Sequence, residues 1–185
     1  RDRIVPGASD NLSGVAGGIL LAQRFLADRP AGVEFVFVTT GCEEAGLGGS
    51  QALAASRADS WDRSDTVIIA IDGLSGGALG TYREGEIFPS RGPAGSEAAG
   101  ERVRGTDDLF RDVTPFEIPV GGTDVVPFAK RGFDGISIGR VDPELHTPRN
   151  YHLPSDTLDR MDVGELVESV DFVEALARDL IRQRA

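Results

Sequence analysis

The most informative stretch of the sequence is VEFVFVTTGCEEAGLGGS, at residues 33–50. Its β-branched and aromatic residues predict a strand at 33–40, and their near-continuous apolar character indicates burial on both faces, as in a sheet covered by helices. The strand pattern stops at two adjacent carboxylates, Glu43 and Glu44. Ligands bind at the carboxyl ends of strands in open α/β sheets, and neighbouring residues that leave a strand point in opposite directions. One glutamate could therefore hold a metal ion while the other faces the water on that metal.

Length and composition indicate a single domain over residues 1–185, with an ordinary hydrophobic core. The net charge of -11, from 19 basic and 30 acidic residues, argues against a nucleic-acid partner. No apolar run reaches the ~18–20 residues that a membrane span needs, and no signal peptide is recognisable. The chain begins with Arg rather than Met, so we expect a piece of a longer protein and leave its compartment open. Cys42 is the one cysteine, which excludes an intrachain disulfide, and we expect it to be a small buried residue.

Hydrophobic periodicity predicts the remaining elements. Helices are expected at residues 11–28, 48–57, around 106–112 and 163–183, and strands at 66–72, 79–82, 116–120 and 135–139. The last helix has a capping-box pattern, Asp162 followed by Glu165, and a clear apolar stripe. Residues 140–161 form a polar loop that carries both histidines. Strands that alternate with helices predict an α/β fold.

Four segments carry candidate metal ligands or a candidate base at predicted strand ends or in loops. They are GASDN with Asp10, GCEEAG with Glu43 and Glu44, IAIDG with Asp72, and NYHLPSD with His152. Carboxylates and an imidazole suit Zn²⁺. Without a cation these carboxylates would repel one another, whereas a bound dication removes that cost and lowers the pKa of its water to about 7. The set predicts hydrolysis, in which a metal-bound hydroxide attacks a carbonyl and a free glutamate relays the proton to the leaving amine.

These segments resemble the co-catalytic zinc aminopeptidases, a family that also includes transferrin-receptor-like and glutamate-carboxypeptidase-like proteins. The resembling segments keep the family's order, span most of the chain and lie at residues 6–17, 41–50, 70–74, 121–139 and 151–162. The resemblance implies a three-layer α/β/α sandwich around a central mixed, mostly parallel sheet. It also implies a cis peptide bond between Asp10 and Asn11.

The resemblance further implies a role for each candidate. Asp10 would bridge two zinc ions, and Glu43 would be the general base. Glu44 and His152 would complete one metal site, and Asp72 would bind the other metal.

One departure from the family concerns the second metal. The family's first zinc ligand is a histidine in a His-x-Asp motif shortly before the GASDN-like segment, and no histidine precedes His146 here. The site at Asp72 would then have only Asp10 and Asp72, whereas Asp10, Glu44 and His152 form an open set of three ligands. We therefore expect this chain to hold one zinc ion or none, and to lack the family's first strands.

Several polar residues near these segments are expected to have supporting roles. Asp124 and Asp156 would hold loops near the pocket, Tyr151 could approach the oxyanion, and His146 is a loop residue. TDV at 123–125 stands where Ser-Asp-His is common in the family, so this chain lacks the histidine of that motif.

Three functions remain open. The leading one is a zinc exopeptidase that removes N-terminal residues from peptides, for which a secreted or cell-envelope location would be ordinary. The second is a glutaminyl-cyclase-like acyltransferase, which uses one zinc held by an Asp, a Glu and a His. The third is a non-catalytic, peptidase-like domain used for binding or assembly.

Overall fold

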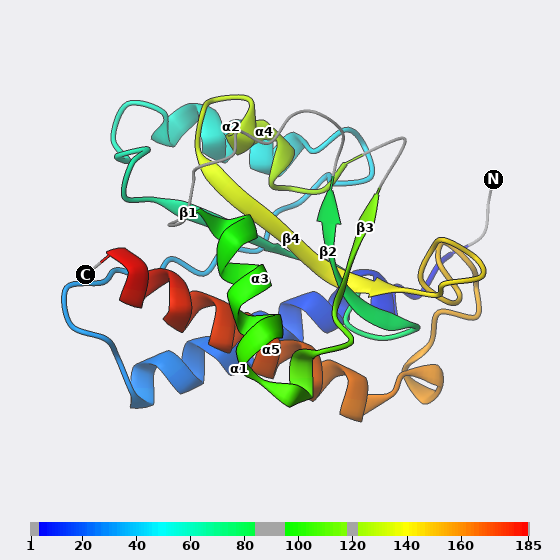
Figure 1. The fold of residues 1–185 in the computed structure, drawn as a ribbon. Coiled ribbons are helices and arrows are strands. Elements are labelled where there is room, and N and C mark those ends of the chain that lie inside the picture. The colour runs from blue at the N-terminus through cyan, green and yellow to red at the C-terminus, as the bar shows by residue number, and fades with distance from the viewer. Residues whose placement is uncertain (1–3, 84–94, 118–121, 185) are drawn as a thin grey trace.

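A mixed sheet of four strands forms the middle layer of the molecule (Figure 1). The structure is a computed structural model that describes residues 4–83, 95–117 and 122–184. The strands are β1 (Val67–Ile71), β2 (Ala78–Arg83), β3 (Thr114–Glu117) and β4 (Asp134–Val141), in the order β1-β4-β2-β3. β1 runs parallel to β4 and β2 parallel to β3, while β2 and β4 are antiparallel. The predicted mixed sheet is confirmed.

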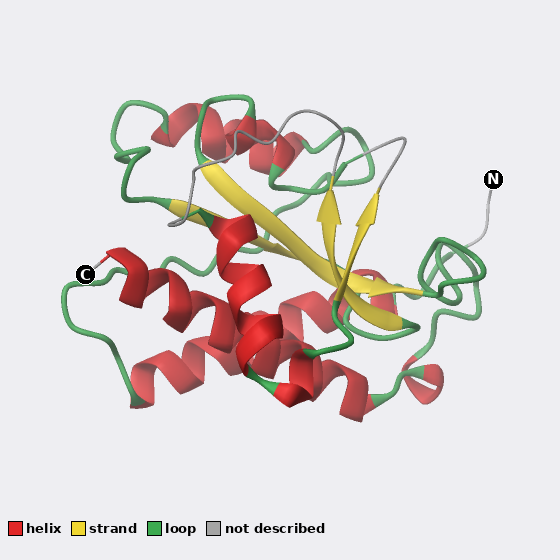
Figure 2. Cartoon of the chain, viewed as in Figure 1, coloured by secondary structure: helices red, strands yellow, loops and turns green. Residues whose placement is uncertain are grey.

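Helices cover both faces of this sheet, so the chain is an α/β/α sandwich (Figure 2). On one face lie α1 (Gly14–Ala27), α3 (Ser96–Thr106) and α5 (Val163–Arg184), and on the other α2 (Gly48–Arg57) and the short α4 (Val126–Ala129). Single turns stand at Ala8–Ser13, Asp108–Phe110 and Leu158–Arg160. No helix in the described part of the chain is long and apolar enough to cross a membrane.

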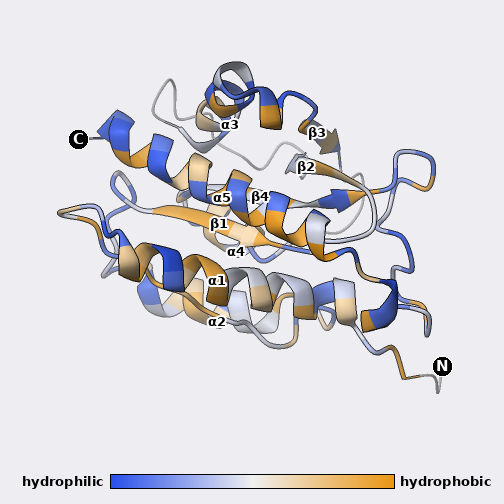
Figure 3. Ribbon diagram, turned by 90° about the horizontal axis from the view of Figure 1, so that it is seen from below, coloured by the Kyte–Doolittle hydropathy of each residue, from blue (hydrophilic) through white to orange (hydrophobic). Residues whose placement is uncertain are grey.

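The main core lies between the sheet and the layer of α1, α3 and α5. Its buried side chains come from all three helices and from the strands, and include Leu21, Phe25, Leu79, Val103, Ile138, Phe172 and Leu176. Figure 3 shows β1 as a strongly hydrophobic strand, while hydrophobic and hydrophilic residues alternate along α5. A smaller cluster of Ala54, Phe128 and Phe133 joins α2 and α4 to the other face.

β4 is the central strand, and all eight of its residues are buried. It continues past the end of β1, and a Cβ atom at Gly139 would lie 2.1 Å from the carbonyl oxygen of Asp72. Only glycine fits there. The close approach fixes Asp72 at the carboxyl end of β1, where its backbone N–H donates to the carbonyl of Ile138 at 2.8 Å.

α5 begins as the capping pattern predicts, with one difference. The Asp162 carboxylate accepts the backbone N–H groups of Gly164 at 2.7 Å and Glu165 at 3.3 Å. The Glu165 carboxylate does not return to Asp162; instead it accepts the Ser75 hydroxyl at 3.0 Å and the Gly76 N–H at 2.7 Å. The helix is thereby joined to the loop after β1.

The strand predicted at 33–40 is wrong. These residues form no regular secondary structure and have no strand partner among the described residues. Phe35 does pack inward, stacked on Phe25 of α1 with ring centroids 4.0 Å apart. Val36, Phe37 and Val38, however, are 50%, 45% and 50% exposed. An apolar run becomes a strand only where a neighbouring strand takes up its backbone hydrogen bonds.

The other predicted elements fall into three groups. The helix at 48–57 is confirmed with the same bounds, and the long helices and the strands at 66–72, 79–82 and 135–139 are confirmed within a few residues. The helix predicted around 106–112 is found only as the single turn at Asp108–Phe110. The longer helix α3 lies earlier and ends at Thr106, and its buried face is built mainly from small residues that give little hydrophobic signal. The strand at 116–120 is found as β3, with residues 118–120 outside the described part.

Candidate metal centre

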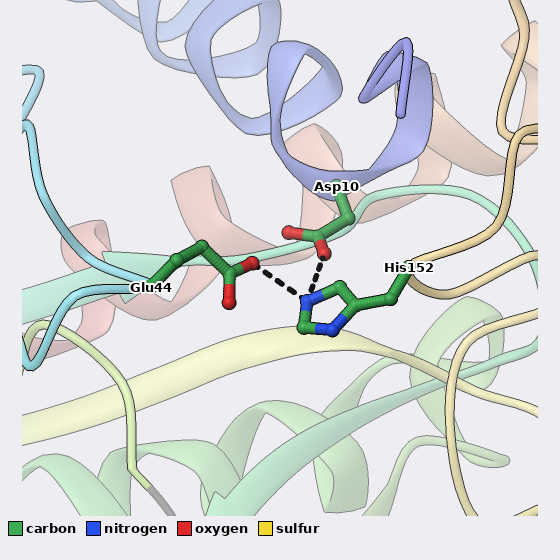
Figure 4. Close-up of side chains that lie close together, drawn as sticks. All are labelled: Asp10, Glu44 and His152. Carbon is green, nitrogen blue, oxygen red and sulfur yellow. Dashed lines mark hydrogen bonds and ion pairs between the residues drawn. The ribbon is translucent and has the colours of Figure 1, made fainter. Parts of the chain in front are cut away.

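Asp10, Glu44 and His152 come together although they are far apart in the sequence (Figure 4). Asp10 lies in the turn before α1, Glu44 in the loop before α2, and His152 in the long loop before α5. The Nε2 atom of His152 is 2.6 Å from Oε1 of Glu44 and 3.3 Å from Oδ2 of Asp10. One ligand atom from each residue lies within 4.8 Å of the other two.

This arrangement fits a divalent cation. Two carboxylates face the same Nε2 atom of His152, yet one ring nitrogen can donate only one hydrogen. The pKa of Asp10 is raised by burial and next by the negative charge of Glu44. A cation between the three side chains would relieve both conflicts. Asp, Glu and His are zinc ligands, and a set of three leaves a fourth position open, as in catalytic sites.

The loop of Asp10 is fixed to the end of β1 by its neighbour Asn11. The Asn11 side-chain amide donates to the Ile71 carbonyl at 2.9 Å, and its oxygen accepts the backbone N–H groups of Gly73 at 3.2 Å and Gly14 at 3.0 Å. The last of these bonds caps the start of α1. The Asp10–Asn11 peptide bond is cis, as the family resemblance implies.

The same loop is fixed to the His152 loop by Asp156. This buried carboxylate accepts the backbone N–H groups of Ser9 and Asp10. The expectation that Asp156 holds a loop near the site is therefore confirmed.

Glu43 lies beside the cluster but is not part of it. Its pKa is raised to about 7, first by burial, then by the negative charges of Glu44 and Asp124. Asp124 accepts a short hydrogen bond from the Thr40 hydroxyl, so it joins the segment before Glu43 to the loop before α4. A carboxylate with a pKa near 7 suits a group that must accept and return protons at neutral pH.

Asp72 does not join the three-ligand cluster. It is half-buried at the end of β1, and its role as a metal ligand stays a prediction. Tyr151 stacks on the ring of His152 with centroids 3.8 Å apart. Burial and the nearby carboxylates, Glu44 foremost, raise the pKa of Tyr151 to about 12. Its hydroxyl is therefore protonated at neutral pH.

Two features of the site differ from the sequence reading or go beyond it. Cys42 was expected to be buried and is exposed, in the left-handed region with φ of 58°, because the chain turns sharply just before Glu43. The bonds of Asn11 were not anticipated. The only signal for them is the Asp-Asn pair directly before a glycine-rich helix start.

Comparisons with known proteins agree on the fold. The model of peptidase family M28 matches residues 2–177. The zinc aminopeptidase BSAP from Bacillus subtilis is 26% identical, with a TM-score of 0.72 over 94% of this chain and 42% of that chain. LapB from Legionella pneumophila is 16% identical, with a TM-score of 0.75 over 97% and 49%. A glutaminyl cyclase from Bacteroides thetaiotaomicron is 18% identical, with a TM-score of 0.68 over 93% and 63%.

The chain therefore spans less than half the length of BSAP and of LapB. A search of curated protein sequences returned no significant match.

Proposed function

We propose, from the premise that this chain belongs to peptidase family M28, that it carries the metal-binding part of a zinc-dependent aminopeptidase acting on the N-terminal bond of peptides. The observation behind the proposal is the convergence of Asp10, Glu44 and His152 from three distant loops, with Glu43 next to them. The similarity to the zinc aminopeptidase BSAP supports the same reaction class.

The roles of the side chains follow from their chemistry. A zinc ion bound by Asp10, Glu44 and His152 would supply a Lewis acid and lower the pKa of a bound water to about 7. Glu43 accepts the proton of the attacking water and returns it to the nitrogen of the leaving amine. That nitrogen must be protonated before the peptide bond breaks. Asp10 and Asp72 would offer two ligands to a second ion, so we expect the three-ligand site to fill first.

The first experiment measures the zinc content of the purified chain after zinc loading and desalting. We expect about one zinc per chain, in keeping with one three-ligand site. About two would mean that the site at Asp72 finds a further ligand. A chain without zinc would contradict the proposal.

The second experiment replaces the proposed base. Glu43→Gln removes the proton acceptor and leaves all three ligands, so turnover of an aminoacyl amide should fall by about 10²–10⁴-fold with zinc content unchanged. Gln51→Glu, on the adjacent helix α2, is a control for altered charge near the site. Activity that persists in the Glu43→Gln variant would remove Glu43 from the mechanism.

A glutaminyl-cyclase-like reaction is the second candidate. It is favoured by the cluster of one Asp, one Glu and one His, which is the one such group among the residues that the structure describes, and by the shared fold. The two reactions are separated by assaying the zinc-loaded chain on an aminoacyl amide and on a peptide with N-terminal glutamine. Release of the free amine from the first substrate indicates a peptidase; loss of ammonia from the second indicates a cyclase. Metal binding without either activity would favour a binding domain.

A further inference from the structure

The carboxylate of Asp156 holds two successive peptide groups of the loop that carries Asp10. Its Oδ1 accepts the N–H of Ser9 at 2.8 Å, and its Oδ2 accepts the N–H of Asp10 at 3.0 Å. The backbone carbonyl of Asp156 accepts a third N–H, from Ala8, at 3.2 Å. The side chain is only 2% exposed, so water competes little for these bonds.

Asp156 is itself fixed to the loop of His152. Its backbone N–H donates to the carbonyl of Leu153 at 3.0 Å, which closes a tight turn directly after His152. The hydroxyl of Ser155 donates to the side chain of Asn150 at 2.8 Å, on the other side of His152. One residue thus joins the backbone of the Asp10 loop to the backbone of the His152 loop.

The residue type at this position matches the geometry. Two adjacent N–H groups need two acceptor oxygens, and an ionised carboxylate offers one to each. An asparagine would face one of the two N–H groups with its own NH₂ group. The carboxylate also brings a further negative charge next to Asp10, which helps to raise the pKa of Asp10. A buried acid in an acidic site is unfavourable on charge alone, so its benefit must come from the bonds it makes.

We propose that Asp156 is a positioning residue that holds Asp10 at the correct distance from His152 for both to bind one metal ion; this role rests on the proposed function of the site. Asn11 fixes the same loop to the end of β1, and Asp156 fixes it to the other ligand. Residues that orient metal ligands in this way typically account for about 10–100-fold in metal affinity.

The test uses two measurements on the 185-residue chain. The first is amide hydrogen exchange at Ser9 and Asp10 in the metal-free protein, which needs no metal. Asp156→Asn should speed exchange at these two amides by about tenfold or more, because one of them loses its acceptor and the local structure opens. The second is titration with Co²⁺, followed by its visible absorption, which should show a Kd raised by about 10–100-fold.

Two variants separate position from charge. Asp156→Glu keeps the charge but lengthens the side chain, and it should also weaken Co²⁺ binding and change the Co²⁺ spectrum. If Asp156→Asn does not fold, Asp156→Glu takes its place in both measurements. Asp159→Asn removes an exposed charge from the same loop and should leave both measurements unchanged, since solvent screens that charge.

The outcomes are distinct. Unchanged exchange at Ser9 and Asp10 in both Asp156 variants, or faster exchange with unchanged Co²⁺ affinity, would overturn the positioning role. So would wild-type affinity in Asp156→Glu, because charge alone would then explain the effect. A wild-type chain that binds no Co²⁺ would instead overturn the proposed function. In that case, loss of exchange protection at Ser9 and Asp10 in Asp156→Asn would still support the link between the two loops.

Discussion

The carboxyl group of Glu43 lies in surroundings that oppose its ionisation. It is half-buried, it follows a turn with a left-handed residue, and three acidic side chains surround it. Its pKa rises from an ordinary 4.5 to about 7. Between these two values the folded chain keeps a proton on Glu43 that the unfolded chain releases. The free energy of unfolding of the metal-free chain therefore falls as the pH rises through this window.

This linkage predicts the behaviour of Glu43→Gln without metal. Glutamine is neutral at every pH, so at pH 8 the variant should be more stable than the wild type, by roughly 1 kcal/mol after allowing for solvent screening. The difference should narrow toward pH 4.5. Urea unfolding in the presence of a chelator measures it, and Glu34→Gln, at an exposed position, is the control. If the two substitutions changed the free energy of unfolding equally, the site of Glu43 would not oppose its ionisation as proposed.

Single residues were predictable where a short motif carries the chemistry. The grouping of Asp10, Glu44 and His152 was implied by the family resemblance of the segments that carry them, and the structure brings the three side chains together. The link from Asp156 to Ser9 was beyond reach in detail, since the two residues are 147 positions apart. No local pattern records which of several acidic residues in a polar loop will accept two backbone N–H groups.

Three elements meet at Asp134, the first residue of β4. This buried carboxylate accepts the backbone N–H of Ser96 at 3.0 Å and its hydroxyl at 2.7 Å, at the start of α3. It also accepts Arg184 at 2.9 Å, from the end of α5. An acid at the start of one helix and a cation at the end of the other both agree with the helix dipoles. The contact joins the central strand to two helices of the same layer.

Asp134→Ala should therefore destabilise the whole domain. It removes the acceptor of the Ser96 N–H at the start of α3 and breaks the ion pair with Arg184, although Arg184 still donates to the Ser64 carbonyl. We therefore expect a loss of about 3 kcal/mol in the free energy of unfolding. Asp108→Ala, which removes an exposed ion pair with Arg111, should cost less than about 1 kcal/mol. Thermal unfolding followed by circular dichroism compares the two. A similar small effect of both would show that the Asp134 contact adds little.

Elements were predictable where the hydrophobic period was long or where neighbours were present. α5 and β4 satisfy these conditions, and both lie where the sequence placed them. The segment at 33–40 has the strongest strand composition but no strand beside it among the described residues. Composition reports a preference for burial, and hydrogen-bonded pairing depends on the rest of the molecule.

The described part of the molecule has an unpaired sheet edge and a short exposed apolar segment. Among the described residues, β1 is an edge strand, made of Val67, three isoleucines and Ala70. Val36, Phe37 and Val38 are exposed. Open apolar edges are sites of further pairing or of self-association. We expect the isolated chain to associate in a concentration-dependent way.

A lysine in the exposed segment 36–38 should suppress that association. Phe37→Lys adds a charge that must be desolvated if the surface is covered. Leu145→Lys changes an exposed leucine in the polar loop instead and should have no effect. Sedimentation velocity over a range of concentrations measures the difference. A wild-type chain that stays monomeric throughout would contradict this expectation.

The separation between Ser9 and Asp156 also has a consequence for biosynthesis. At about 5–20 residues per second, a ribosome needs roughly 7–30 s to add the residues between them. During that interval Asp10 and Glu44 have emerged without the imidazole of His152, and β1 has emerged without β4. The nascent chain thus offers a cation only scattered carboxylates, which bind weakly. Metal selection in this protein therefore belongs to a stage after the loop of His152 has left the ribosome and closed on the loop of Asp10.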